Sequence, residues 1–159
     1  MPYPNMELIK SIADDLNYFF QFQLNPEAIH LAAFIAKDSD NKTAYIEKYS
    51  RFLTDPTINM KTIRLDGEIV GSISKFMMFG EAEITYWIDR KYWGKGIGAG
   101  ALQMFLETET TRPIYGRVAF DNIGSQKVLE KCGFIKVGED KGFANARQEE
   151  ITEYIYKLS

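Results

Sequence analysis

Four glycines stand at every second position in the segment Asp89-Arg-Lys-Tyr-Trp-Gly-Lys-Gly-Ile-Gly-Ala-Gly100. Residues 82–89 alternate apolar and polar side chains, which predicts a strand. The residues after the glycines predict a helix, because one helical face carries Ile97, Ala101, Leu102, Phe105 and Leu106. Missing side chains let backbone N–H groups approach an anion closely, and a helix N-terminus attracts negative charge. The segment therefore predicts a pyrophosphate-binding turn between a strand and a helix.

Two common nucleotide-binding loops do not fit this segment. A P-loop needs Gly-x-x-x-x-Gly-Lys-Ser/Thr, but Lys95 is followed by Gly96. The Rossmann pattern Gly-x-Gly-x-x-Gly has a different spacing, and the strand before the glycines follows other antiparallel strands instead of opening a βαβ unit. The phosphate-binding turn therefore belongs to a different fold.

The remaining pattern predicts one α+β domain over residues 1–159, built on a mixed sheet of about seven strands with flanking helices. Asp66-Gly67 is a strong two-residue hairpin signal, and Asn25-Pro26 and Gly133 are good helix start and stop signals. The predicted order is a strand at 7–12, helices beginning near 15, 26 and 42, strands at 58–65, 68–79 and 82–89, a helix from 97, a strand at 113–120, a helix at 122–132, and strands at 134–137 and 151–158. The apolar face of the second helix continues to Ile35.

Composition excludes several functional classes. A formal net charge of −3 argues against nonspecific nucleic-acid binding, and neither a signal peptide nor an apolar run of membrane-spanning length is visible. We therefore expect no nucleic acid or membrane partner and a cytoplasmic location. Cys132 and His30 are the only residues of their types, which predicts no disulfide and no typical zinc or other metal site. A Ser-His-Asp hydrolase would need His30, which lies in a predicted helix, and no Gly-x-Ser-x-Gly is present.

Two motifs carry a family resemblance. Trp93 through Gly98 resembles the pattern Arg/Gln-x-x-Gly-x-Gly/Ala, and residues 121–134 resemble Asn-x-x-Ser/Ala followed by a helix and Gly-Phe. Both are hallmarks of the GNAT (Gcn5-related N-acetyltransferase) superfamily, and the resemblance covers residues 58–158 well. Trp93-Gly94 and Val128-Leu-Glu-Lys131 are similar to the branch with the ribosomal-protein N-terminal acetyltransferases.

The resemblance implies a GNAT acyl-CoA N-acyltransferase fold, in which the fourth and fifth strands splay apart and the pantetheine arm of acetyl-CoA pairs in the gap like an added strand. It implies that Asn122 binds the pantetheine amide, although Asn122 also suits an N-cap, and that Ser125 lies beside the cofactor. The other cofactor-binding residues that it implies are Ile88, Asp89 and Arg90 for pantetheine and Trp93, Gly94, Lys95, Gly96, Ile97, Gly98 and Ala99 for the pyrophosphate.

The implied activity is transfer of acetyl from acetyl-CoA to a primary amine, on a protein N-terminus or a small molecule, by direct attack in a ternary complex. We predict Glu83 as the catalytic base; its alternative interpretation is an exposed strand carboxylate, and Glu81 and Asp89 are weaker candidates. The acceptor pocket is expected between the N-terminal helices and the turn at 76–81, with a lining drawn from Tyr18, Phe19, Phe22, His30 and Phe34.

Two positions depart from the family pattern. Trp93 replaces Arg or Gln, with Arg90, Lys91 and Lys95 as nearby cations. Leu129 replaces a tyrosine that in many relatives protonates the departing thiolate. Ser125 is our candidate donor, with Tyr86 and Tyr115 as alternatives, although a thiol pKa near 8.5 also makes unassisted departure tolerable. Leu129 keeps open a second function, a non-catalytic acetyl-CoA sensor or scaffold, and a homodimer is compatible with the resemblance.

Overall fold

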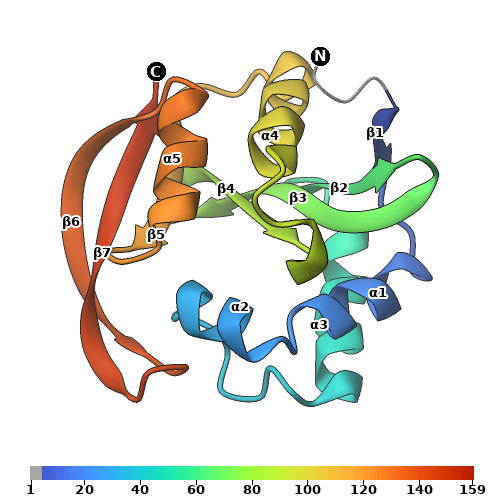
Figure 1. The fold of residues 1–159 in the computed structure, drawn as a ribbon, viewed down its shortest axis with the longest axis horizontal. Coiled ribbons are helices and arrows are strands. Elements are labelled where there is room, and N and C mark those ends of the chain that lie inside the picture. Colours follow the sequence, from blue (N-terminus) through green and yellow to red (C-terminus); the bar gives the residue numbers. More distant parts are fainter. Residues whose placement is uncertain (1–4) are drawn as a thin grey trace.

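In the computed structural model, which describes residues 5–159, a seven-stranded mixed sheet runs through the middle of the molecule (Figure 1). The helices and strands follow the predicted order, so the predicted fold class is confirmed. The elements are β1 (Met6–Lys10), α1 (Asp15–Phe22), α2 (Pro26–Ala32), α3 (Lys42–Thr54), β2 (Asn59–Leu65), β3 (Glu68–Met78), β4 (Glu81–Ile88), the 3-10 turn η1 (Arg90–Tyr92), α4 (Ile97–Thr108), β5 (Ile114–Ala119), α5 (Ile123–Lys131), β6 (Ile135–Ala144) and β7 (Glu149–Leu158).

The strands lie in the order β1-β2-β3-β4-β5-β7-β6. The pair β4–β5 is parallel, and the other neighbouring pairs of the described sheet are antiparallel. Asp66 and Gly67 both have positive φ, 52° and 82°, as the favoured two-residue hairpin between β2 and β3 requires. The chain beyond β4 must cross over through α4 to reach β5 in the parallel direction, and this crossover places the glycine-rich turn at the end of β4.

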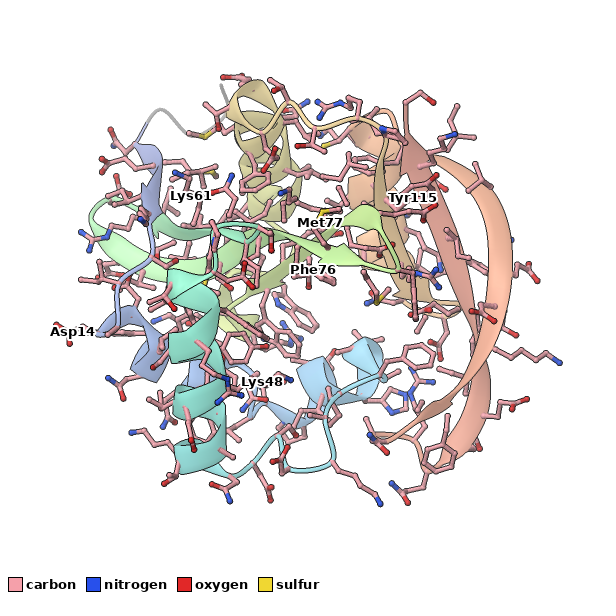
Figure 2. All side chains as sticks on the ribbon, turned by 180° about the vertical axis from the view of Figure 1, so that it is seen from behind. Asp14, Lys48, Lys61, Phe76, Met77 and Tyr115 are labelled. Carbon is pink, nitrogen blue, oxygen red and sulfur yellow. The ribbon has the colours of Figure 1, made fainter. Side chains whose placement is uncertain are left out.

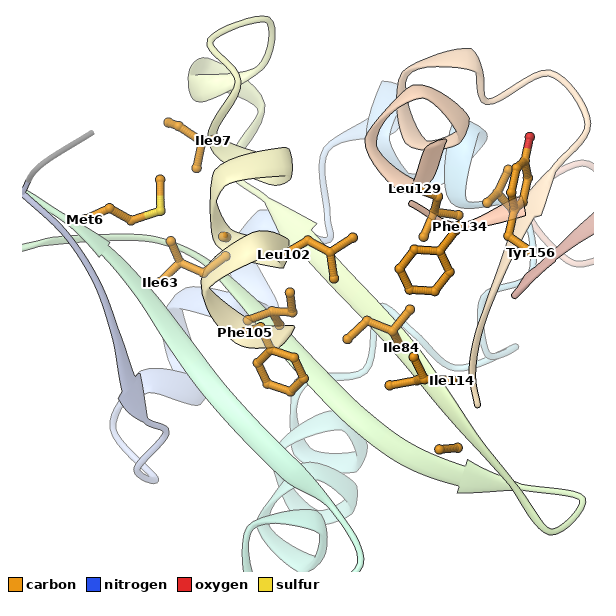
Figure 3. Close-up of a cluster of buried hydrophobic side chains, with 14 of the residues drawn as sticks. Met6, Ile63, Ile84, Ile97, Leu102, Phe105, Ile114, Leu129, Phe134 and Tyr156 are labelled. Carbon is orange, nitrogen blue, oxygen red and sulfur yellow. The ribbon is translucent and has the colours of Figure 1, made fainter. Parts of the chain in front are cut away.

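Helices α4 and α5 cover one face of the sheet, and α1, α2 and α3 lie on the other (Figure 1). The main core lies under α4 and α5, where Leu102 and Phe105 pack against strand residues such as Ile63 and Ile84 (Figure 3). A second cluster joins α1 and α3 to the opposite face through Leu16, Phe19 and Met60. Because both faces of β4 are covered, its two sets of alternating side chains enter two different environments.

The fourth and fifth strands splay apart as expected. Strand β4 pairs with β5 only over three positions, from Ala82 opposite Ile114 to Ile84 opposite Gly116. Its other edge stays paired with β3 as far as Ile88, whereas β5 continues along β7. The edge of β4 beyond Ile84 therefore has no strand partner among the described residues, and its backbone groups can pair with a ligand.

Two boundaries differ from the predictions. We predicted a strand at 134–137, but β6 runs over Ile135–Ala144, because pairing with β7 extends a glycine-rich and charged stretch that has little strand propensity of its own. We also expected the helix after Pro26 to continue to Ile35. It stops at Ala32 because Ala33 adopts φ 63° and ψ −58° and the N–H of Phe34 donates to the carbonyl of Ala32 at 2.6 Å.

The turn between β6 and β7 holds the end of α2 in place. The guanidinium of Arg147 donates to both carboxylate oxygens of Asp121, at 2.8 and 2.9 Å, and to the carbonyl of His30 at 2.7 Å. The N–H of Ala146 also donates to the carbonyl of Ala33. Such bidentate, charge-assisted contacts are strong and directional, so α2 is fixed beside the loop that leads into α5. Among the described residues, no helix has the length and apolarity needed to cross a membrane.

Candidate active site

A cleft of about 790 Å3 lies where β4 and β5 separate. Its walls come from the end of β4, the glycine-rich turn, the first turn of α4, helix α5 and three small or apolar residues of α2, namely Ala28, Leu31 and Ala32. This volume is that of a small-molecule or cofactor site. Small residues such as Gly94, Gly96, Gly98 and Gly124 leave the backbone of two wall segments open to this space, which suits a ligand recognised partly through main-chain hydrogen bonds.

The glycine-rich turn opens directly onto this cleft. Gly94 and Gly96 both have φ 77°, a left-handed conformation that side-chain-bearing residues rarely adopt, and Gly96 is the N-cap of α4. Gly98 plays a different role, since a Cβ there would lie 3.4 Å from a methyl group of Val128, so its absence lets α4 approach α5. The first N–H groups of α4 have no carbonyl partner within the helix and face the cleft residues, as an anion site requires.

The side chains beside this turn brace one another. The indole Nε1 of Trp93 donates to the carbonyl of Ile88 at 2.8 Å, and the Arg90 guanidinium lies 4.6 Å from the centroid of the Trp93 ring. Arg90 also forms an ion pair with Glu27 of α2 at 2.7 Å. Trp93 thus contributes shape and rigidity to the turn, which is a physical reason why Trp is tolerated where related patterns have Arg or Gln.

A hydroxyl pair lies at the α5 side of the cleft. The hydroxyls of Tyr86 and Ser125 are 2.7 Å apart, and the Tyr86 hydroxyl also donates to the Ser125 carbonyl at 3.2 Å. Burial raises the pKa of Tyr86, so its hydroxyl stays protonated at neutral pH. Both residues line the cleft, so a protonated O–H group is available beside a bound ligand.

A second cleft of about 860 Å3 opens on the α1 and α3 face of the sheet. Phe19 and Phe22 of α1, Tyr45 and Tyr49 of α3 and the outer part of the β3–β4 hairpin form its walls. The two clefts share residues at the split between the strands, which are Ala32, Ile84, Thr85, Tyr86, Trp87, Arg117 and Ala119. Ligands in the two clefts would therefore meet at β4.

A cluster of charges lies at the inner end of the second cleft. Glu83 is 2% exposed, and its carboxylate lies 3.5 Å from Nε of Arg117. The same guanidinium lies 3.3 Å from Glu153 and 3.6 Å from Asp140. Burial raises the pKa of Glu83, and the Arg117 charge offsets part of that rise. Burial likewise raises the pKa of Glu153. A carboxylate with a raised pKa is a stronger base than an exposed one, as proton abstraction at neutral pH requires.

Two buried donors beside this cluster are unsatisfied. Within the described residues, Nε1 of Trp87 and Nε of Arg117 have no hydrogen-bond partner, since the 3.5 Å ion pair with Glu83 does not make a well-formed hydrogen bond. Buried polar groups without partners are uncommon in folded proteins. Their position at the junction of the clefts fits a site completed by a ligand.

Comparison with known families agrees with this geometry. The family model described as the acetyltransferase (GNAT) domain matches residues 6–135. The chain belongs to the GNAT acetyltransferase domain family.

Relatives and solved structures extend the comparison. A Bacillus licheniformis protein named uncharacterized N-acetyltransferase p20 is 31% identical over 83 residues, and the match spans about half of this chain (50%) and about half of that relative (47%). RimL, a ribosomal L7/L12 alpha-N-protein acetyltransferase solved with coenzyme A, has a TM-score of 0.81 at 18% identity over 98% of this chain and 95% of its own. The microcin C7 self-immunity acetyltransferase MccE, solved with acetyl-CoA and AMP, has a TM-score of 0.78 at 16% identity over 99% and 93%.

Most of the predicted cofactor-binding residues of this GNAT domain line the first cleft, namely Ile88, Trp93, Gly94, Gly96, Ile97, Gly98, Ala99, Asn122 and Ser125. Three do not: Asp89, Arg90 and Lys95 lie outside its lining. The side-chain oxygen of Asn122 accepts from the N–H of Ser125 at 3.3 Å, so the N-cap interpretation holds in this structure. Lys91 also lies outside this lining, with Nζ 5.3 Å from the Tyr92 ring centroid.

Of the candidate proton donors, Ser125 and Tyr86 lie side by side, whereas Tyr115 (Figure 2) lines neither of these two clefts. The interpretation of Glu83 as an exposed carboxylate is wrong, because β4 is covered on both faces. Phe19, Phe22 and Phe34 line the second cleft as expected. Tyr18 and His30 do not.

Sequence reasoning missed two sets of residues. Lys127 and Lys131 line the first cleft, and their spacing of four residues on the helix after Asn122 was a usable signal. Arg117, Glu153 and Asp140 join Glu83 only because β4, β5, β7 and β6 are neighbours in that order. No local pattern could have revealed this cluster.

Proposed function

We propose that this protein is an acetyl-CoA-dependent N-acetyltransferase that acts on a primary amine by direct attack in a ternary complex. The observation that carries the proposal is the meeting of two clefts at the split between β4 and β5. One is lined by the phosphate-binding turn and the other by a buried carboxylate. Membership in the GNAT family supports the same activity.

The first cleft fits acetyl-CoA. The unpaired edge of β4 can pair with the amide groups of a pantetheine arm. The turn at Gly94 and Gly96 with the start of α4 suits the pyrophosphate, and Lys127 and Lys131 supply positive charge for the phosphates. Acetyl-CoA supplies a thioester carbonyl that an amine can attack. RimL and MccE, two proteins of similar fold, were solved with coenzyme A and acetyl-CoA, respectively.

The second cleft supplies the base. A primary amine is mostly protonated at neutral pH, and Glu83 takes that proton so that the nitrogen lone pair is free. The nitrogen then bonds to the thioester carbonyl carbon, the carbon–sulfur bond breaks, and the second proton leaving the nitrogen replaces the one that Ser125 gives to the departing sulfur. Ser125, hydrogen-bonded to Tyr86, donates a proton to the departing sulfur in place of the tyrosine that Leu129 replaces. Holding both reactants at one point of the sheet provides much of the rate.

The acceptor is either a protein N-terminus or a small amine. Proteins of similar fold include enzymes for both kinds of acceptor. RimL is a ribosomal-protein acetyltransferase, and a SpeG chimera from Vibrio cholerae and hSSAT is a spermidine N-acetyltransferase. The single domain over residues 1–159, the cytoplasmic location and a homodimer stay predictions of the sequence.

Calorimetry with acetyl-CoA, followed by detection of free thiol in the presence of a panel of amines, tests the proposal. We expect acetyl-CoA to bind and one class of amine to release coenzyme A. Binding without thiol release for peptides, polyamines and monoamines would favour the sensor or scaffold function. The absence of acetyl-CoA binding would contradict both.

A further inference from the structure

Aromatic side chains dominate the walls of the second cleft. Tyr45 and Tyr49 of α3 are stacked with their ring centroids 4.2 Å apart, and Phe76 of β3 lies across the cleft from the helix that carries Lys48 (Figure 2). The complete aromatic lining is Phe19, Phe22, Phe34, Tyr45, Tyr49, Phe76, Phe79, Tyr86 and Trp87. Rings of this kind gain energy by covering apolar or aromatic surface of a ligand.

Negative charge is densest at the inner end of this cleft. Three carboxylates, Glu83, Asp140 and Glu153, surround the single guanidinium of Arg117. They leave an excess of negative charge next to the split between β4 and β5. One ammonium group is stabilised there, at the place where its nitrogen must react.

The α3 side of the cleft lacks this excess of negative charge. Lys48 and Arg51 line it, and in residues 5–159 neither forms an ion pair with a carboxylate. Nζ of Lys48 lies 5.9 Å from the ring centroids of both Tyr49 and Phe52, so the protein itself already supplies the cation beside these rings. Glu47 is the only carboxylate that α3 contributes to this lining. Asp38, in the loop before α3, also lines this wall, and its charge and that of Glu47 equal the charges of Lys48 and Arg51. A second ammonium group on the acceptor would therefore meet rings and a wall with no excess of negative charge.

Resting on the proposed function, we propose that the acceptor is a primary amine on an apolar or aromatic body that carries no second positive charge. The amine lies at the carboxylate cluster, and the body lies between α1, α3 and the β3–β4 hairpin. Polyamines and aminoglycosides are disfavoured because only the inner end of the cleft has an excess of negative charge.

The test compares 2-phenylethylamine with spermidine, by thiol release and by calorimetry on the coenzyme A-saturated protein. We expect kcat/KM for 2-phenylethylamine to exceed that for spermidine at least about tenfold, a difference of about 1.4 kcal/mol. Lys48→Glu combined with Arg51→Glu, both on the exposed surface of α3, should reduce this ratio about tenfold or more by creating a second site for a cation. Lys42→Glu makes the same kind of change on α3 outside the cleft and should leave the ratio unchanged.

A preference for spermidine, a preference for a peptide N-terminus over 2-phenylethylamine, or a ratio unaffected by the double charge reversal would overturn the inference while leaving the proposed function standing. Absence of 2-phenylethylamine binding to the coenzyme A-saturated protein would overturn it as well. Failure of acetyl-CoA to bind is a different result, since it contradicts the proposed function itself.

Discussion

The two clefts meet at one strand but are built from different material. The first includes two continuous chain segments rich in glycine and small side chains, the turn after β4 and the start of α5, together with larger residues of β4 and β5. The second consists of large side chains from α1, α3 and six strands. A site that recognises its ligand through main-chain groups tolerates substitution of the surrounding side chains. A site that recognises its ligand through side chains does not. The first cleft therefore carries the family resemblance, and the second carries the choice of acceptor.

Strand β4 contributes to both clefts because its successive side chains point to opposite faces of the sheet. Ile84 and Tyr86 point toward the α4 and α5 face, while Glu83 lies on the other face with Arg117. If one cleft binds acetyl-CoA and the other binds the acceptor, as proposed, substitutions on one face of β4 should affect the function of one cleft and leave that of the other unchanged. The following predictions test this division, beginning with the largest expected effect.

Glu83→Gln should lower kcat about 10²–10⁴-fold, the usual contribution of a general base, while acetyl-CoA affinity measured by calorimetry stays unchanged. Burial disfavours the Glu83 carboxylate, so folding favours its protonated form, and stability from this group falls as pH rises through its raised pKa. The Glu83→Gln substitution should therefore not lower Tm at neutral pH. Glu81→Gln, at the exposed start of the same strand, is the control. Unchanged turnover in Glu83→Gln would remove Glu83 from the mechanism.

Gly96→Ala should weaken acetyl-CoA binding about tenfold, because a left-handed conformation costs a residue with a Cβ about 1–2 kcal/mol and the turn would shift to relieve it. The KM for the amine should stay the same. Gly67→Ala introduces the same kind of strain, at φ 82°, in a hairpin remote from both clefts. It should lower Tm without changing acetyl-CoA affinity. An equal loss of acetyl-CoA affinity in both variants would mean that the loss in Gly96→Ala reflects lower stability of the fold and not a change in the binding turn.

Ser125→Ala should lower kcat roughly threefold to tenfold near neutral pH, because a thiolate with a pKa near 8.5 departs tolerably without a proton donor. The difference from the parent protein should shrink above that pH. Tyr86→Phe removes the partner hydroxyl 2.7 Å away and should change kcat in the same direction by less. A pH-independent loss in Ser125→Ala would indicate a packing effect and exclude the donor role.

Glu153→Gln should have the smallest effect, a displacement of the acidic limb of the kcat–pH profile. Glu83 must be ionised to act, so the rate rises with pH through its pKa. Negative charge on Glu153 contributes to raising that pKa, so its removal should move the limb to lower pH. Glu150→Gln, exposed on the same strand, should not move it. A loss of turnover as large as expected for Glu83→Gln would instead assign the base to Glu153.

The amount that sequence could predict differs between these regions for a physical reason. The turn at Gly94 and Gly96, the N-cap at Asn122 and the stop at Gly133 depend on conformations set within a few residues, so their spacing alone reveals them. The strand β6 was predicted too short because its outer half is strand only through pairing with β7. The end of α2 at Ala33 was missed because contacts with the distant Ala146 and Arg147 hold it.

Sequence by itself determined the order of helices and strands, the glycine-rich turn and the family, since each follows from local backbone preference or from contiguous motifs. Only the tertiary structure decided which charges surround Glu83, that this carboxylate is buried, and that rings from α1, α3 and β3 face it across one cleft. These features depend on which strands become neighbours and on which face a helix packs. Burial and charge proximity, which set the pKa of Glu83 and the character of the acceptor cleft, arise only when residues far apart in the chain come together.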